Sequence, residues 1–313
     1  MAGSAVRNRW QLPETDPRWL VIRPMVDRLV ILYLAGTSVI YWWNGVPAVS
    51  HRIIFVIHWL AIGAIVLLRR WLSVRPPAYR SGLQWLHALY PVAALPFLYR
   101  ELAVLNRIVT DRYYDPLVRR WEQWLFPSAP VMRLSQWIDH LVLSEFLHFS
   151  YISYYWMIVA LSLTLYCGRR YRQYQIYVFT LLLTFYFCYL WFIFFPVEGP
   201  RYSVAPLDPT LRGGPFYRLS HWILSQGAAR GTAFPSSHVA AGVVTLLCAW
   251  TMAPRLFWIM LPFAIGLVVG TVYGRFHYAV DAAAGLGVAF LFRWIGPMLY
   301  RRIAEDECTG EQR

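Results

Sequence analysis

One stretch of the sequence places a proline, two serines and a histidine directly before a long apolar segment: Pro235-Ser236-Ser237-His238. A helix that begins there points its free backbone N–H groups and the positive end of its dipole at whatever lies in front of it, which favours a phosphate group. Ser236 or Ser237 would be the N-cap residue of that helix. His238, in the first turn, could then give a proton to a group bound at the helix end.

A second stretch, from Tyr273 to Asp281, contains a histidine and an aspartate at helical spacing. His277 and Asp281 are four residues apart, so on a helix they share a face and the carboxylate can hold the imidazole in one tautomer. Between the two histidines the sequence predicts a hairpin: a helix of about 16 residues, a turn at Pro254-Arg255 and a helix of about 20 residues. Both legs are roughly as long as a bilayer is thick, so the hairpin returns His238 and His277 to the same end.

The composition indicates an integral membrane protein. The chain has 313 residues, of which 58% are hydrophobic and only 14% charged, and the apolar residues occur in runs near the length of a membrane-spanning helix. The net charge of +13 comes with basic residues that are all arginine and mostly flank the apolar runs, which argues against a nucleic-acid partner. The four cysteines have no spacing typical of a disulfide framework or a metal site. We therefore expect no metal and no cofactor.

Hydropathy predicts an all-α, polytopic bundle of about eight transmembrane helices. Eight spans place both termini on one side of the membrane, and the short arginine-rich loops on that side mark it as cytoplasmic. Both histidine motifs therefore face the extracytoplasmic side. The expected spans are 29–43, 53–68, 83–99, 149–166, 174–195, 237–253, 256–273 and 278–298.

The chain is expected to have three regions. Residues 1–75 hold an N-terminal tail and two additional spans, residues 76–300 hold a six-helix core, and residues 301–313 form a disordered tail. The core includes the long segment 100–148, in which residues 113–143 place apolar side chains near one helical face and charged ones elsewhere. We interpret 113–143 either as amphipathic helices in the membrane interface or as a partly buried cap over the bundle.

An arginine follows the fifth expected span in the stretch Pro196-Val197-Glu198-Gly199-Pro200-Arg201. Two prolines and a glycine restrict how the chain leaves the span, which keeps Arg201 near the membrane surface on the same side as the two histidines. Its guanidinium can bind phosphate oxygens in a fork. Glu198 is interpreted as structural, and Tyr202 and Tyr278 as interfacial aromatic residues.

Three motifs in this order resemble the type 2 phosphatidic acid phosphatase superfamily: an arginine after one span, Pro-Ser-x-His at the start of the next, and His-x-x-x-Asp at the start of a later one. The resemblance covers roughly residues 149–298 and implies a six-span core that the third span completes. Within that superfamily, the motifs look most like the branch that contains inositol phosphorylceramide synthases and their bacterial relatives.

The sequence departs from the phosphatase pattern at two positions. The pattern has a lysine where this chain has Phe194 and an arginine where this chain has Thr271, so two phosphate-binding cations are absent. A phosphomonoester dianion needs more positive charge than a monoanionic diester, so the departures favour transfer of a head group over plain hydrolysis of a monoester. Arg275, two residues before His277, could replace one of the absent cations. Further candidates are Arg212, Arg218 and Arg230.

The resemblance and the residue chemistry together imply a membrane enzyme that acts on lipid phosphates. His277 would attack phosphorus, Asp281 would orient it, and His238 would protonate the leaving oxygen and then activate a lipid alcohol or water. The non-bridging oxygens would be held by Arg201, Arg275 and the backbone N–H groups of Ser236 and Ser237. The other histidines are interpreted as interfacial or hydrogen-bonded: His51, His58, His87, His140, His148 and His221.

Two other functions remain open at this stage. One is hydrolysis of a lipid phosphomonoester by the same residues. The other is a non-catalytic lipid-binding scaffold, against which the presence of Arg201, His238, His277 and Asp281 together argues. A transporter is less favoured because the sequence shows no inverted repeat.

Overall fold

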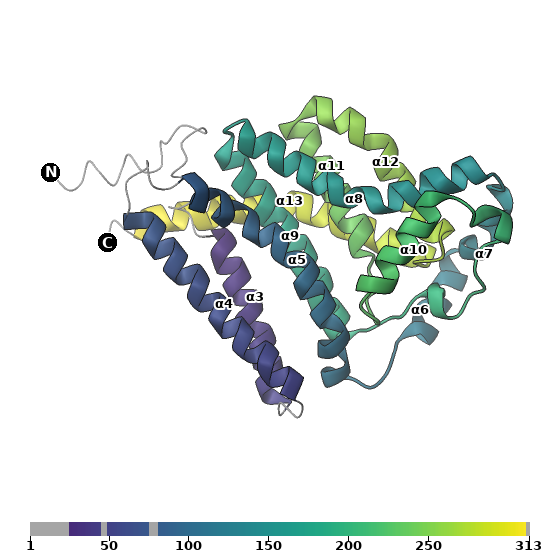
Figure 1. Cartoon of the computed structure of the whole chain (residues 1–313), viewed down its shortest axis with the longest axis horizontal. Coiled ribbons are helices and arrows are strands. Elements are labelled where there is room, and N and C mark those ends of the chain that lie inside the picture. The colour runs from purple at the N-terminus through teal and green to yellow at the C-terminus, as the bar shows by residue number, and fades with distance from the viewer. Residues whose placement is uncertain (1–24, 45–48, 75–80, 311–313) are drawn as a thin grey trace. The chain divides into compact units, whose positions relative to one another are not determined.

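The computed structural model describes residues 25–44, 49–74 and 81–310. Within these ranges all the named elements are helices, and a single β-bridge joins Val197 to Thr232. The predicted all-α fold is therefore confirmed (Figure 1). The elements are α3 (Met25–Trp43), α4 (Val49–Val74), α5 (Ser81–Val109), α6 (Asp115–Leu125), α7 (Pro130–Trp137), α8 (Leu141–Cys167), α9 (Tyr171–Phe194), the 3-10 turns η3 (Pro200–Tyr202) and η4 (Pro209–Leu211), α10 (Pro215–Gly227), α11 (Ser237–Met252), α12 (Pro254–Tyr273) and α13 (Ala279–Gly310).

Seven of the described helices are long and apolar enough to cross a membrane: α3, α4, α5, α8, α9, α12 and α13. Helix α11 is equally apolar but has only 16 residues. These eight helices correspond to the eight expected spans. Several of them expose large aromatic side chains, such as Trp59, Trp250 and Trp258. Such surfaces are suited to contact with lipid rather than water, so the structure supports an integral membrane protein.

Helix α13 is longer than the sequence suggested. It continues to Gly310, so the structure replaces the expected disordered tail with helix as far as that residue. Residues 301–309 include no glycine or proline, so the sequence offers no signal that would end the helix earlier.

The predicted hairpin is formed by α11 and α12, which pack against each other (Figure 1). Their lengths of 16 and 20 residues agree with the expectation. Ala253 ends α11, and Pro254 occupies the first turn of α12, where a helix has no need of the missing N–H. The proline therefore separates two helices that would otherwise continue as one apolar run.

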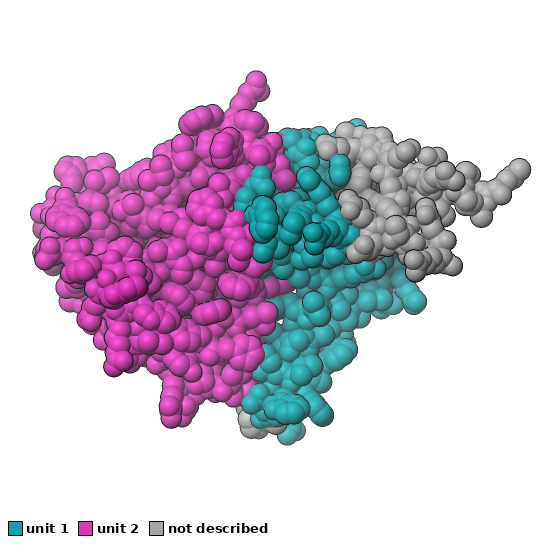
Figure 2. Space-filling model, turned by 180° about the vertical axis from the view of Figure 1, so that it is seen from behind, with its two compact units in different colours: residues 1–95, 162–183, 293–313 teal, residues 96–161, 184–292 magenta. Residues whose placement is uncertain are grey.

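The chain forms two compact units, drawn in different colours in Figure 2. One comprises residues 1–95, 162–183 and 293–313, and the other residues 96–161 and 184–292. All the residues of the two histidine motifs belong to the second unit. The expected division at residue 75 stays a prediction.

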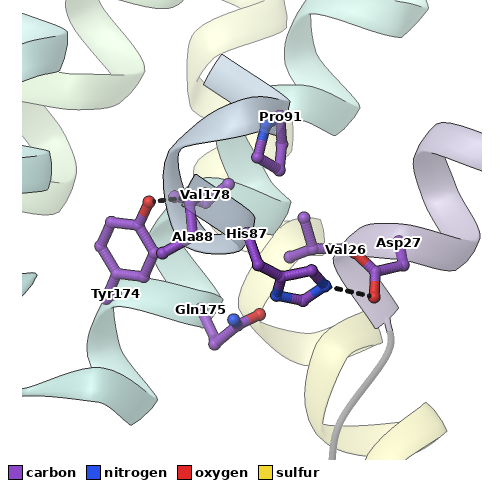
Figure 3. A pocket seen from close by; sticks show the side chains of 8 residues that line it. All are labelled: Val26, Asp27, His87, Ala88, Pro91, Tyr174, Gln175 and Val178. Atoms are coloured by element: carbon purple, nitrogen blue, oxygen red, sulfur yellow. Dashed lines mark hydrogen bonds and ion pairs between the residues drawn. The ribbon is translucent and has the colours of Figure 1, made fainter. Parts of the chain in front are cut away.

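The first unit contains a buried carboxylate at the start of α3 (Figure 3). Asp27 Oδ2 lies 3.0 Å from His87 Nε2, and Asp27 Oδ1 accepts a hydrogen bond of 2.7 Å from the Tyr90 hydroxyl. A charge in an apolar bundle is costly unless it is paired, and here both partners come from α5. The cluster therefore attaches α3 to α5.

We expect the Asp27→Ala variant to be strongly destabilised. The substitution leaves the His87 and Tyr90 donors without their acceptor in a buried site, which costs on the order of 3 kcal/mol. Thermal unfolding in detergent measures the effect. The control is Asp111→Ala, because the Asp111 side chain is 91% exposed. Equal unfolding midpoints for the two variants would contradict this role of Asp27.

Candidate active site

The hairpin brings the two motif histidines together. The ring centroids of His238 and His277 are 5.7 Å apart, and the two residues are only 8% and 4% exposed. His238 lies in the first turn of α11, whereas His277 lies in the turn after α12. The predicted return of both histidines to one end is thus confirmed.

His277 is oriented mainly by a backbone carbonyl. Its Nδ1 lies 2.9 Å from the Ala233 carbonyl oxygen and 3.6 Å from Asp281 Oδ2. Because a carbonyl can only accept, Nδ1 carries the hydrogen and Nε2 keeps its lone pair. The sequence had placed His277 on the same helix as Asp281, but α13 begins at Ala279. The expected tautomer of His277 is therefore set by the Ala233 carbonyl, which lies outside α13. The Asp281 carboxylate is the more distant neighbour of Nδ1.

Asp281 is fully buried in the first turn of α13. Its Oδ2 accepts a 2.8 Å hydrogen bond from the Tyr278 N–H, and its backbone carbonyl accepts a 3.0 Å bond from the Ser236 N–H. The second of these bonds joins the two histidine motifs directly. Asp281 can thus stabilise positive charge on the imidazole of His277 while its backbone positions the start of α11.

His238 is enclosed by tyrosines that the sequence did not identify. Tyr151 from α8 stacks on it at 5.1 Å between ring centroids, and the Tyr151 hydroxyl lies 3.3 Å from His238 Nε2. Tyr154 meets the same imidazole edge-on at 4.8 Å. Both tyrosines come from a helix that begins almost a hundred residues before His238, so no local pattern could have revealed them.

The start of α11 offers donors for an anion. Ser236 is the N-cap residue, and its hydroxyl accepts from the Val239 N–H at 3.4 Å. Its own N–H is donated to Asp281, so Ser236 positions the helix rather than offering the expected backbone donor. Ser237 is the first helical residue, and within the described residues neither its N–H nor that of His238 has an acceptor. These two N–H groups can receive phosphate oxygens.

Gly199 lies in the stretch 196–201, where this stretch meets the residues next to both histidine motifs. Its φ is +84°, and a Cβ at this position would lie 3.0 Å from the Ala233 Cβ and 3.1 Å from the Phe276 carbonyl oxygen. The glycine therefore allows the loop to approach the residues next to His277 closely. Arg201, two residues later, is half-buried and has no carboxylate within 4.0 Å among the described residues, so its guanidinium stays available to an anion.

We expect the Gly199→Ala variant to lose activity more than stability. The left-handed backbone costs roughly 1–2 kcal/mol with a Cβ, and the loop must also move away from the histidine motifs. Turnover should fall about tenfold or more if Arg201 shifts by even 1 Å. Gly213→Ala is the matched control, because a Cβ at Gly213 meets nothing within 4 Å. Unchanged turnover in Gly199→Ala would show that the loop need not be held this closely.

Two carboxylates from α6 hold the backbone of the site. Asp115 accepts from the N–H groups of Glu198 and Gly199, both at 2.9 Å. Glu122 accepts from the first N–H groups of α13, those of Ala279 and Val280, at 3.2 and 2.8 Å. Burial raises the pKa of Glu122, and these two hydrogen bonds partly offset the effect.

The segment 113–143 is thus both amphipathic and part of the unit that contains the two histidine motifs. The buried face of α6 carries Asp115, Val118 and Glu122, while Trp124 and Leu125 on the same helix are exposed. The buried contacts of Asp115 and Glu122 support the cap interpretation over helices that merely lie in the interface.

The other candidate arginines differ in their surroundings. Arg275 has a left-handed backbone (φ 59°), and its guanidinium donates to the Ala205 carbonyl and, at 3.2 Å, to the Ser135 hydroxyl. Arg230 forms an ion pair with Glu198, which explains the structural role expected for that glutamate. Arg212 donates to the Leu207 carbonyl, and Arg218 is exposed on α10.

The two positions that depart from the phosphatase pattern supply no cation. Phe194 is 56% exposed at the end of α9. Thr271 is buried, and its hydroxyl donates to the Val268 carbonyl at 2.8 Å. The described residues contain no group of three or more histidine, cysteine, aspartate or glutamate side chains suited to a metal ion.

Comparison with known protein families matches residues 117–295 to the PAP2 superfamily. The match includes all seven residues predicted for the site: Arg201, Ser236, Ser237, His238, Arg275, His277 and Asp281. No curated protein and no solved structure matches the chain.

Proposed function

Because the chain belongs to the PAP2 superfamily of phosphatases and phosphotransferases, we propose that it transfers a phosphate or phospho-head-group from a membrane lipid through a phosphohistidine intermediate. One observation carries the proposal. His277 has its Nδ1 bound by the Ala233 carbonyl, so its Nε2 lone pair is available next to His238 and to the free N–H groups of α11. A nucleophile, an acid–base group and an anion-binding helix end are thus combined in one buried place.

In the first step His277 Nε2 forms a bond to phosphorus while the ester P–O bond to the leaving group breaks. His238 gives its proton to the leaving oxygen. The imidazole of His277 becomes positively charged, and Asp281 stabilises that charge across 3.6 Å. Arg201 and the N–H groups of Ser237 and His238 hold the non-bridging oxygens as negative charge builds.

In the second step an acceptor hydroxyl attacks phosphorus and the P–N bond to His277 breaks. His238, now neutral, takes the acceptor's proton and is ready for the next cycle. The acceptor is a lipid alcohol in transfer and water in hydrolysis. On the predicted topology the reaction takes place at the extracytoplasmic surface.

We favour transfer, as in the inositol phosphorylceramide synthase-like branch, over hydrolysis of a monoester. The reason is charge: the side chains at 194 and 271 are uncharged, and Arg201 is the one arginine in the stretch 196–202. A phosphodiester carries one negative charge and a phosphomonoester nearly two. A non-catalytic scaffold is less favoured because it would have no need of an oriented His277 beside His238.

The test is a panel of lipids with labelled phosphate, given to the purified protein with and without diacylglycerol or ceramide. Label that moves from a diester to the acceptor lipid supports transfer. Release of inorganic phosphate from monoesters supports hydrolysis instead. If no lipid loses label in wild-type protein while the protein still binds lipid, the scaffold is the correct alternative.

A further inference from the structure

A group of basic side chains, Arg212 and Arg275, lies next to the histidine pair and is not used in the two steps proposed above. They hold neighbouring parts of one segment: Arg275 donates to the Ala205 carbonyl and Arg212 to the Leu207 carbonyl. The segment is fixed in turn, because Leu207 and Leu211 pack with Leu147 and Tyr273 in a buried cluster. The two guanidinium groups are therefore kept close together by contacts within the fold.

The positive charge of this group is not balanced by ion pairs. Among the described residues no carboxylate lies within 4.0 Å of Arg201, Arg212 or Arg275. Asp208 acts on Arg212 through its charge, but it is fully exposed and its carboxylate accepts from the Thr210 N–H and hydroxyl.

A second nearby carboxylate is also engaged. Glu145 accepts from the N–H groups of Phe216 and Tyr217 at the start of α10, at 2.6 and 3.0 Å. Like charges held together repel one another, so an additional anion would stabilise the group.

Two histidines border the group, and both have the same orientation. His148 Nδ1 bonds to the Ser144 carbonyl at 2.8 Å, and His221 Nδ1 bonds to the Tyr217 carbonyl at 2.9 Å. Each ring thus directs Nε2 away from its own helix backbone. With the hydrogen on Nδ1, each Nε2 keeps a lone pair, so it can accept a hydrogen bond but cannot bind an anion. The Arg275 Nε–H is a donor, and it is buried without a partner among the described residues. Buried polar atoms without partners are rare and favour a missing ligand.

Aromatic rings connect these side chains to one another. His221 stacks on Tyr217 at 4.0 Å and lies 5.8 Å from His148, measured between ring centroids. Burial lowers the pKa of His221, the bond to Tyr217 opposes this, and the charges of Arg201 and Arg212 lower it further. His221 is therefore neutral near pH 7 and adds no charge of its own to the repulsion.

Phe276 separates the group from the histidine pair. It precedes His277, and its ring lies 5.4 Å from that of His221 and 4.3 Å from that of Tyr151, which stacks on His238. The charge of Arg201 acts on Tyr151, which stacks on His238, and also on His221, which borders the basic group. Arg201 therefore lies near both the histidine pair and the basic group.

We propose that Arg212 and Arg275 form a second anion subsite, which binds an additional phosphate-class group on the head group of the lipid substrate. The ring of Phe276 lies between the subsite and the histidine pair. This arrangement suits a head group that carries its second anion near the phosphate under attack. The proposal rests on the proposed function, and it narrows the substrate to lipids with a doubly anionic head group.

The test compares two donors that differ by one phosphate, phosphatidylinositol and phosphatidylinositol monophosphate. We expect wild-type kcat/KM to be at least about tenfold higher for the monophosphate, as one charge-assisted contact allows. Arg212→Gln should remove this preference and change turnover of phosphatidylinositol less than about twofold, and Arg275→Gln should remove the preference as well. Arg218→Gln is the matched control, because Arg218 is exposed on the same helix as His221.

Arg212→Lys is the control for misfolding of the loop, because it keeps the positive charge and should keep part of the preference for the monophosphate. If Arg212→Gln and Arg275→Gln preferred the monophosphate as strongly as Arg218→Gln does, the subsite would be wrong. Inorganic phosphate is the further probe: if it inhibits wild type and not Arg212→Gln while the donors are used equally, the group binds free phosphate and the head-group assignment is wrong. A wild-type protein that turns over neither donor nor any lipid of the panel would instead contradict the proposed function.

Discussion

The His277→Ala variant is expected to lose at least about 10⁴-fold in turnover of every lipid substrate, because in the proposed mechanism it lacks the atom that forms the bond to phosphorus. The loss should appear in kcat, since Arg201 and the start of α11 still bind the substrate. Single-turnover and steady-state measurements in detergent check this. Thermal unfolding in the same detergent must be measured beside turnover, because the substitution removes the donor of the Ala233 carbonyl and the neighbour of the buried Asp281 carboxylate.

His140→Ala is the matched control for His277→Ala. His140 is an exposed histidine of the same unit and has no predicted role. If His277→Ala kept more than about a hundredth of wild-type turnover, another group would have to be the nucleophile.

The His238→Ala variant is expected to lose about 10³-fold in turnover of a natural lipid, because the leaving oxygen then departs without a proton. The loss should depend on the leaving group. A nitrophenyl ester leaves readily as an anion, so with this substrate the first step should be nearly as fast in His238→Ala as in wild type. The burst of nitrophenol measures that step alone.

The Tyr151→Phe variant separates the role of His238 from that of its neighbours. It removes the hydroxyl 3.3 Å from His238 Nε2 and keeps the stacked ring. We expect a loss of only about tenfold, which is smaller than that of His238→Ala. An equally large loss with the nitrophenyl ester and the natural lipid in His238→Ala would mean that His238 acts by holding structure and not by proton transfer.

Much of the geometry of the candidate site was predictable because it depends on local signals. Pro254 ends one apolar run and starts the next, which gave the lengths of α11 and α12 and hence the meeting of His238 and His277. The serine cap of α11 followed from the motif itself, and the structure selects Ser236. Such features need only residues within a few turns of each other.

The supporting contacts were not predictable because they join distant parts of the chain. Asp115 binds backbone groups 83 and 84 residues away, and Glu122 reaches the start of α13 across 157 residues. Nothing near either carboxylate distinguishes it from a solvated charge on an amphipathic helix. The Ala233 carbonyl that orients His277 is a backbone atom, so the sequence carries no sign of it.

The measurement that most directly tests the account is capture of the covalent intermediate. Wild-type protein mixed with a phosphate-labelled lipid and quenched within milliseconds should carry label on His277 that acid removes and base does not. The Asp281→Asn variant should carry less, because its charged intermediate is less stabilised. Label on His277 at a rate matching turnover is the predicted result. Turnover without any labelled protein, or label that persists in His277→Ala, would contradict the account.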